Sequence, residues 1–211
     1  MNGKQIRALG LAAALVGWSF TAGLDRPWRR HPVAQAAYGT ALAVATRSSM
    51  GLRPPALQSG LRLGVAVAGA VGAGVAVTTM APRVRAAMGH RDLPEDPARW
   101  LGVEIPLGTV WSEETAFRGA LATVAADAFG PGGGRLLQAA TFGLTHVPDA
   151  FETGEPIIGT VLATGAAGWV FALLRERSGS LLAPMLAHLA INEAGALAAL
   201  AVQRFGDRPD G

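Results

Sequence analysis

The segment Glu104–Phe129, EIPLGTVWSEETAFRGALATVAADAF, combines the length of a membrane span with charged residues near its centre. A helix needs about 20 predominantly apolar residues to cross a bilayer. Glu113, Glu114 and Arg118 lie in the middle of this segment. A carboxylate at the centre of a membrane helix costs about 2.5 kcal/mol or more, so such residues face a protein interior or a water-filled cavity. The segment therefore predicts an internal functional site.

Further apolar segments lie on both sides of this one. In chain order, the apolar segments are Ala8–Leu24, Val33–Thr46, Leu61–Ala81, Glu104–Phe129, Arg135–Val147, Ile157–Leu174 and Leu181–Phe205. The second and fifth are short for a span, so they either cross with little tilt, extend into the polar region or re-enter the membrane. We therefore predict an all-α fold, a polytopic membrane helix bundle of about seven helices.

The composition of the whole chain supports this fold class. Only 16% of its 211 residues are charged and 50% are hydrophobic, whereas a soluble domain carries about 25% charged residues. The net charge of +3 comes from basic residues scattered in short groups between apolar segments, as at helix ends that face lipid headgroups. This scatter argues against a nucleic-acid partner. The absence of cysteine excludes disulfides, thiol catalysis and cysteine-ligated metals.

We predict one structural domain with three parts. Residues 1–100 form membrane helices and a polar loop without a motif, residues 101–205 form the helical core that carries the chemistry, and residues 206–211 form a disordered tail. The segment Met1–Leu24 begins like a signal peptide, with basic residues before an apolar run. Because further apolar segments follow, a first membrane helix is favoured over a cleaved signal.

Two stretches interrupt the apolar pattern. Pro82–Trp100 is the longest polar stretch, and Gly130–Gly134, which contains a proline, is a break that no helix would cross. The third apolar segment contains Gly64, Gly69, Gly72 and Gly74. Small residues let membrane helices approach closely, so these glycines predict a helix contact surface, although a general bias of composition would also produce them.

The charged residues of the fourth segment divide by helical position. Glu114 and Arg118 stand four residues apart, so they share a helix face and can form an ion pair. Glu113 points about 100° away and is free for a chemical role. In the alternative interpretation, all three residues form one inert buried cluster.

Two of the four histidines lie in apolar segments. His146 ends the fifth segment, four residues after Phe142, and His188 lies in the seventh with Asn192 one turn further on the same face. A single histidine on an apolar helix is more often a satisfied core residue than a ligand. Two histidines, a same-face asparagine and a doubled glutamate together indicate a site.

Such a set of side chains can hydrolyse an amide without a covalent intermediate. A carboxylate and an imidazole can activate one water by general-base catalysis, and a second histidine with an asparagine amide can donate hydrogen bonds to the developing oxyanion. Alternatively, Glu113, His146 and His188 could ligate Zn²⁺ and leave one open position. No HExxH sequence is present. The expected cofactor is therefore none, or zinc if the activity depends on a metal.

Three short motifs resemble those of a known family. Glu113–Gly119 matches EExxxR with an FRG ending, Phe142–His146 matches FxxxH, and His188–Asn192 matches HxxxN, in this order and in separate apolar segments. Over roughly Val103–Ala198 the chain resembles the CAAX protease and bacteriocin-processing (CPBP, or ABI) membrane proteases. The resemblance implies an all-helical intramembrane endopeptidase fold.

The resemblance also implies roles for individual residues. Glu113 would be the catalytic carboxylate, His146 its partner on the water, and His188 with Asn192 the oxyanion site. The supporting positions would be Glu114, Arg118 and Phe142. We prefer a metal-independent mechanism, because three zinc ligands would leave Asn192 as the only clear oxyanion donor.

The expected partners are a protein or peptide substrate at the membrane and the lipid bilayer. In eukaryotic members of the family the substrate is a prenylated CAAX protein, but a host without prenylated proteins would not supply one. The expected location is a bacterial cytoplasmic membrane. Two other functions remain open: a non-catalytic immunity or partner-binding scaffold, and a small transporter or proton relay. The transporter ranks last, because we find no internal repeat.

Overall fold

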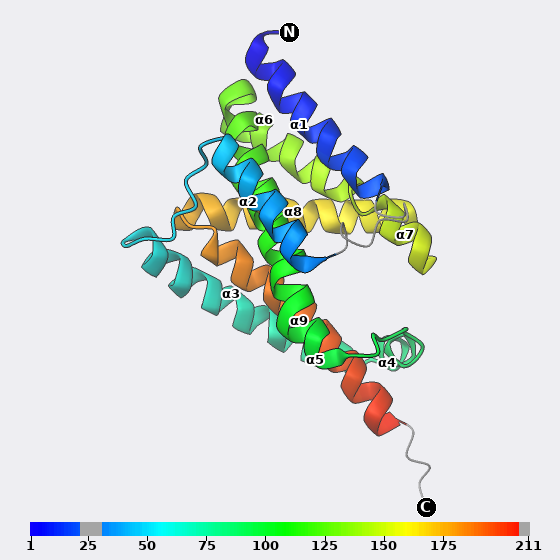
Figure 1. The fold of residues 1–211 in the computed structure, drawn as a ribbon. Helices are drawn as coiled ribbons and strands as arrows, with labels where there is room; N and C mark the ends of the chain where they lie inside the picture. Colours follow the sequence, from blue (N-terminus) through cyan, green and yellow to red (C-terminus); the bar gives the residue numbers. More distant parts are fainter. Residues whose placement is uncertain (22–30, 207–211) are drawn as a thin grey trace, which may run out of the picture.

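The computed structural model describes residues 1–21 and 31–206, and within them the chain is helical without a β-strand (Figure 1). The elements in chain order are α1 (Gly3–Phe20), α2 (Pro32–Ala45), α3 (Ala56–Thr79), α4 (Pro82–Gly89), α5 (Pro97–Arg99), the π-helical segments η2 (Trp100–Trp111) and η3 (Glu114–Leu121), α6 (Ala122–Leu144), α7 (Val147–Thr153), α8 (Ile157–Ser178) and α9 (Leu182–Gly206).

Every predicted apolar segment is helical in its described part, which confirms the all-α bundle. Among the described residues, three helices, α3, α8 and α9, are long and apolar enough to cross a membrane. Residues 22–24 of the first predicted segment lie outside the described part of the chain. So does the predicted tail beyond Gly206, the residue that ends α9.

The segment that carries the acidic pair is not a plain α-helix. It runs from α5 through η2 and η3 into α6, and η2 and η3 have the wider π-helical turns. Pro106 lies inside η2 and cannot donate a backbone hydrogen bond. The expected spacing of 100° per residue is therefore wrong here, because a π-helix closes i→i+5 hydrogen bonds. π-type turns occur frequently at functional sites.

The predicted break at Gly130–Gly134 is present. Gly130 has a φ of +73°, so α6 consists of two helical parts joined at this residue. A Cβ atom at Gly134 would lie 2.6 Å from the backbone nitrogen of Ala126. The two parts of α6 therefore touch backbone to backbone, which only glycine permits at this position.

Two stretches contain short helices that the sequence reading did not predict. Within the polar stretch Pro82–Trp100, α4 and α5 each begin with a proline at the first helical position, where the missing N–H costs nothing. After His146 the chain forms α7 before it reaches α8. All three helices are short and lack an apolar periodicity, which explains why the sequence pattern did not show them.

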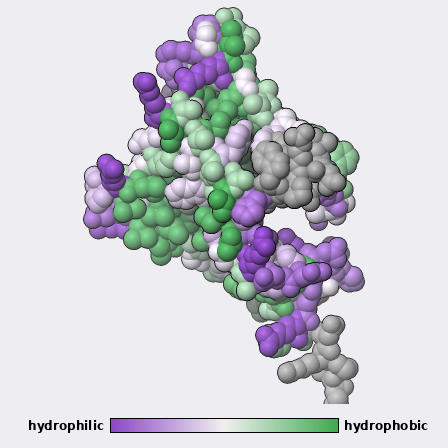
Figure 2. Space-filling model, in the orientation of Figure 1, coloured by the Kyte–Doolittle hydropathy of each residue, from purple (hydrophilic) through white to green (hydrophobic). Residues whose placement is uncertain are grey.

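The packing places η3 at the centre of the molecule. All residues of η3 are buried. The helix α2 packs on η2 and η3, α1 packs along α6, α8 packs on α6, and α3 lies along α9 (Figure 1). Large apolar side chains remain exposed on the outer helices, among them Leu61, Val65, Ile158 and Leu162, and Figure 2 shows a hydrophobic face over α3. Lipid is the solvent that such a surface requires.

Glycines bring some of these helices into close contact. A Cβ at Gly64 would lie 2.8 Å from the Leu186 side chain of α9, whereas one at Gly69 would meet nothing within 4 Å. The predicted glycine surface of α3 is therefore a contact surface only in its first part. Gly39 of α2 is the tightest contact with the motif segment, because a Cβ there would lie 2.4 Å from the backbone oxygen of Ser112.

We expect Gly39→Val to destabilise the fold, because α2 would be forced away from η2 and η3. Overpacking of this kind costs about 1–3 kcal/mol. The measurement is the thermal unfolding temperature of the purified protein in a neutral detergent. Gly69→Val is the matched control, since it makes the same change on a helix with open space. Equal unfolding temperatures for the two variants would contradict the packing described here.

Candidate active site

The four side chains predicted to be catalytic line one cavity. Glu113 comes from the junction of η2 and η3, His146 from the turn between α6 and α7, and His188 and Asn192 from α9. The cavity has a volume of about 480 Å³. Segments that lie far apart in the sequence therefore bring these groups together, while their catalytic roles stay predictions.

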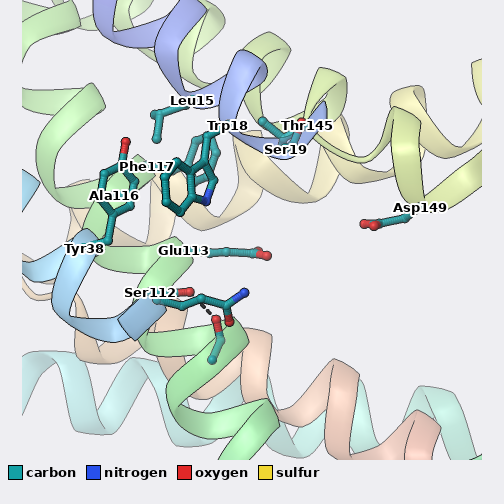
Figure 3. Close-up of a pocket in the computed structure, with 12 residues that line it drawn as sticks. Leu15, Trp18, Ser19, Tyr38, Ser112, Glu113, Ala116, Phe117, Thr145 and Asp149 are labelled. Carbon is teal, nitrogen blue, oxygen red and sulfur yellow. Dashed lines mark hydrogen bonds between the residues drawn. The ribbon is translucent and has the colours of Figure 1, made fainter. Parts of the chain in front are cut away.

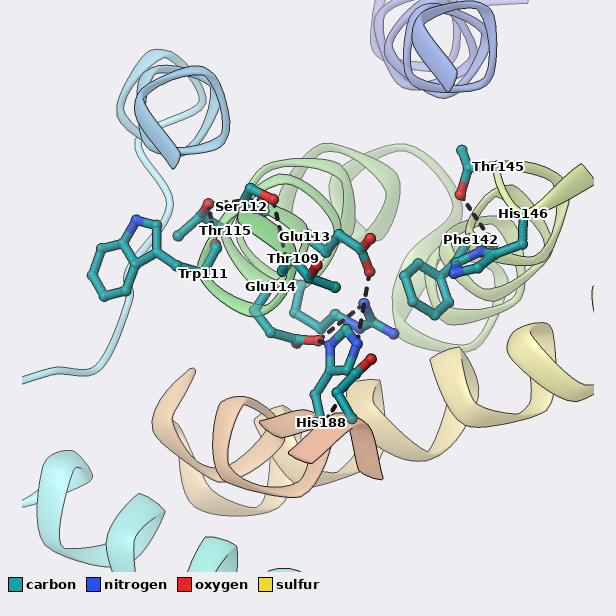
Figure 4. Close-up of polar contacts among 12 residues, drawn as sticks. Thr109, Trp111, Ser112, Glu113, Glu114, Thr115, Phe142, Thr145, His146 and His188 are labelled. Carbon is teal, nitrogen blue, oxygen red and sulfur yellow. Dashed lines mark hydrogen bonds and ion pairs between the residues drawn. The ribbon is translucent and has the colours of Figure 1, made fainter. Parts of the chain in front are cut away.

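Glu114 lies behind this cavity in a buried ionic network. Its Oε1 is 3.2 Å from Nη1 of Arg118, and both side chains have no exposed surface. The same oxygen is 2.8 Å from Nδ1 of His188 (Figure 4). The expected Glu114–Arg118 pair is present, and it extends to a histidine that the sequence reading had not linked to Glu114.

This network orients the imidazole of His188. An ionised carboxylate only accepts hydrogen bonds, so Nδ1 of His188 carries the proton and donates it to Glu114. The other nitrogen, Nε2, is then 3.8 Å from Oε2 of Glu113. This distance is too long for a hydrogen bond. Catalytic hydrogen bonds are often loose in the absence of substrate.

The two adjacent glutamates occupy different environments. The side chain of Glu114 is fully buried, whereas that of Glu113 is 27% exposed. Glu113 also borders a neighbouring cavity of about 190 Å³ between α1, α2 and the motif segment (Figure 3). Solvent can therefore reach part of the Glu113 side chain but none of the Glu114 side chain.

The other two polar groups are held by backbone hydrogen bonds. Nδ1 of His146 lies 2.8 Å from the carbonyl oxygen of Phe142, to which it donates, and this leaves Nε2 unused. The amide nitrogen of Asn192 donates to the carbonyl oxygen of His188 at 3.1 Å. Figure 4 shows His146 on a helix across the cavity from Glu113, and no hydrogen bond joins these two described residues.

Aromatic rings fix the positions of the charged groups. The ring of Phe142 packs edge-on against His146, with centroids 4.7 Å apart, and the guanidinium carbon of Arg118 lies 4.0 Å from the Phe142 centroid. Phe171 stacks on His188 at 5.0 Å. A cation over an aromatic face is stabilised by the ring quadrupole. Phe142 therefore packs against both His146 and Arg118, while its supporting role in the site stays a prediction.

Several residues that line the cavity were not predicted from the sequence, notably Gln35, Asp149 and Phe171. Gln35 is a polar residue in the short second apolar segment, and this position could have indicated that its side chain faces the interior. Asp149 follows His146 closely in α7, outside the predicted spans. Partial burial raises the pKa of the Asp149 carboxyl, the nearby charge of Glu113 adds to this, and His146 opposes it.

The residues considered for zinc do not form a metal site in this arrangement. Each histidine holds its Nδ1 proton in a hydrogen bond, as zinc-bound histidines do. However, within residues 1–21 and 31–206 no three His, Cys, Asp or Glu side chains are grouped closely enough to hold a metal ion. Glu113, His146 and His188 therefore do not fit zinc as they stand.

Comparison with known proteins gives one match. Residues 96–194 match the family model described as type II CAAX prenyl endopeptidase Rce1-like. The matched region includes the three motifs and all four cavity side chains named above. No curated protein and no solved structure matched the chain.

We expect Glu114→Gln to lower the stability of the protein strongly. The substitution leaves the fully buried Arg118 without its counterion, and breaking a buried ion pair in this way costs about 3–5 kcal/mol. The thermal unfolding temperature in detergent measures this loss. Glu113→Gln is the matched control, since its partly exposed side chain holds no buried cation. Similar unfolding temperatures for both variants would contradict the structural role of Glu114.

Proposed function

We propose that this chain, whose residues 96–194 belong to the family of Rce1-like type II CAAX prenyl endopeptidases, cuts peptide bonds of a membrane protein or lipid-associated peptide within the bilayer. The family is one of intramembrane endopeptidases, and three apolar helices of the described residues can span a membrane. The observation that carries the proposal is the single cavity lined by Glu113, His146, His188 and Asn192.

Glu113 is the proposed general base. Its side chain lines the cavity and is only 27% exposed, so the carboxylate can hold a water without being fully solvated. As the water oxygen attacks the carbonyl carbon of the substrate, Glu113 takes one of its protons. Nε2 of His146, which makes no hydrogen bond among the described residues, faces the same cavity and would hold the water from the other side.

His188 and Asn192 are the proposed oxyanion donors. Asn192 uses one amide N–H on the carbonyl of His188 and has a second to offer. Because the Nδ1 proton of His188 is bonded to Glu114, a donor role at Nε2 requires the imidazolium form of the ring. Donors held in place before the reaction stabilise the tetrahedral intermediate without reorganisation. Collapse of this intermediate breaks the C–N bond, and Glu113 returns its proton to the leaving amine.

The substrate is proposed as a membrane or lipid-associated protein or peptide in a bacterial cytoplasmic membrane. The cavity next to Glu113 is bordered by Trp18, Tyr38 and Phe117, and the rings of Trp18 and Tyr38 are stacked with centroids 4.5 Å apart. This aromatic wall suits an apolar side chain or an apolar modification beside the bond that is cut.

We expect Glu113→Gln to abolish cleavage, because an amide cannot accept the proton of the attacking water. Loss of a general base typically lowers the rate by about 10²–10⁴-fold. Quantitative proteomics of membranes from cells that express wild type or Glu113→Gln should reveal substrates that accumulate uncut. Glu193→Gln is the matched control, since Glu193 is the neighbour of Asn192 in α9 but is not part of the cavity.

If Glu113→Gln is inserted and folded and still processes the same proteins, the proposed mechanism is wrong. A phenotype that persists in Glu113→Gln cells would then support the alternative function, a non-catalytic immunity or partner-binding scaffold. The buried Glu114–Arg118–His188 network would serve such a scaffold equally well.

We expect the activity to be independent of zinc. The purified protein should contain far less than one zinc per chain, and a zinc chelator should leave cleavage of a substrate found by proteomics unchanged. A chelator added to an established zinc protease serves as the positive control. Stoichiometric zinc, together with a loss of activity in the chelator that added zinc reverses, would contradict the metal-independent mechanism.

A further inference from the structure

A third cavity, separate from the two that Glu113 borders, is lined by three arginines. Arg118, Arg135 and Arg175 border it together with the acidic Glu176, and its volume is about 220 Å³. It lies between η3, the two parts of α6 and the end of α8, and it shares no lining residue with the cavity of Glu113. Three cations and one acid therefore border one small cavity.

The charges around this cavity do not balance within the described residues. Arg118 is paired with Glu114 at 3.2 Å, and Arg135 is paired with Glu176 at 3.1 Å. Arg175 forms no ion pair with any carboxylate in the part of the chain that the structure describes. One positive charge is therefore left at the cavity after both acids have been counted.

Buried donors at the cavity also lack acceptors. The side chain of Arg118 has no exposed surface, yet its Nε, Nη1 and Nη2 donate no hydrogen bond to the described residues, and neither does Nε of Arg175. An unsatisfied buried donor costs about 1–3 kcal/mol, and more if it is charged. Arg118 is packed against Phe142 without exposed surface. The guanidinium groups that a ligand in the cavity can reach are therefore those of the partly exposed Arg135 and Arg175.

Two of the arginines are already held in position. Nη2 of Arg175 donates to the carbonyl oxygen of Ser49. The guanidinium of Arg135 lies 4.8 Å from the ring of Trp169 and is bonded to Glu176. A site whose side chains are fixed before binding loses less entropy when the ligand arrives.

The location of the cavity at the end of α8 indicates the source of the anion. The helix α8 is a candidate membrane span, and Arg175 and Glu176 lie in its last turn. The end of a span is the level of the lipid headgroups, where arginine meets phosphate. Guanidinium groups bind phosphate oxygens in pairs.

We propose that this cavity binds the phosphate group of an anionic phospholipid, with Arg175 and Arg135 as its donors and the buried charge of Arg118 behind them. The site is distinct from the proposed peptidase centre and does not depend on it. The negative charge of Glu176 disfavours a ligand with more negative charge than a phosphate diester.

The test uses the full chain, purified in a neutral detergent. Thermal unfolding is followed with increasing dihexanoyl-phosphatidylglycerol and, in a second arm, with inorganic phosphate. We expect phosphatidylglycerol to raise the unfolding temperature of wild type. Arg175→Gln should weaken this binding by about tenfold or more, the value of a lost charge-assisted hydrogen bond. Arg177→Gln is the matched control, because it removes the same charge from the same turn outside the cavity.

Each outcome decides the proposal. Stabilisation by phosphatidylglycerol alone supports a lipid headgroup, and stabilisation by both probes supports a phosphate site that free phosphate can also fill. No stabilisation by either probe overturns the proposal, and so does an equal loss in Arg175→Gln and Arg177→Gln. If Arg175→Gln fails to fold, Ala122→Leu replaces it, since leucine at this lining position fills the cavity and keeps every arginine. Unchanged binding in Ala122→Leu would also overturn the proposal.

Discussion

The Oε1 atom of Glu114 is shared by two partners from different parts of the chain. Arg118 contacts it from the next turn of η3, and His188 contacts it from α9. A buried charge without compensation costs several kcal/mol, and more so in a bilayer, where water cannot take the place of a missing partner. The contact between Glu114 and His188 therefore fixes η3 relative to α9, because breaking it would leave a buried charge with less compensation. The ring of Phe142 packs on Arg118 and brings α6 into the same network.

The contacts of Glu114 determine which role is open to its neighbour Glu113. Because the network fixes the ring of His188 through Nδ1, Nε2 is turned toward Glu113. Glu113 itself takes no part in the buried pairing and borders two cavities. Glu114 thus stabilises the structure, whereas the side chain of Glu113 remains partly accessible to water. The wide turns of η3 change the local helix spacing without separating Glu114 from Arg118.

Much of the fold and the polar part of the site could be predicted from the sequence, for a physical reason. Charged residues in an apolar segment must face the interior, so the motif spacing around Glu113, His146 and His188 carries three-dimensional information. The sequence gives no such information for Phe171, because an apolar residue in an apolar helix can face either lipid or His188. Likewise, Gly64 and Gly69 have the same sequence context, and only packing shows that one of them touches α9. The π-helical turns and the short helices α4 and α7 have no periodic pattern that would predict them.

In lipid, helices associate through packing and polar contacts rather than through the hydrophobic effect. A membrane protein of this kind must therefore use its buried polar residues both to hold the helices and to build the site. Glu114, Arg118 and His188 belong to both tasks, so a loss of activity after their substitution does not separate chemistry from folding. Glu113 is different, because its partly exposed carboxylate contributes little to the packing. Substitution of Glu113 can therefore distinguish an enzyme from a scaffold, because it should change activity without a large loss of stability.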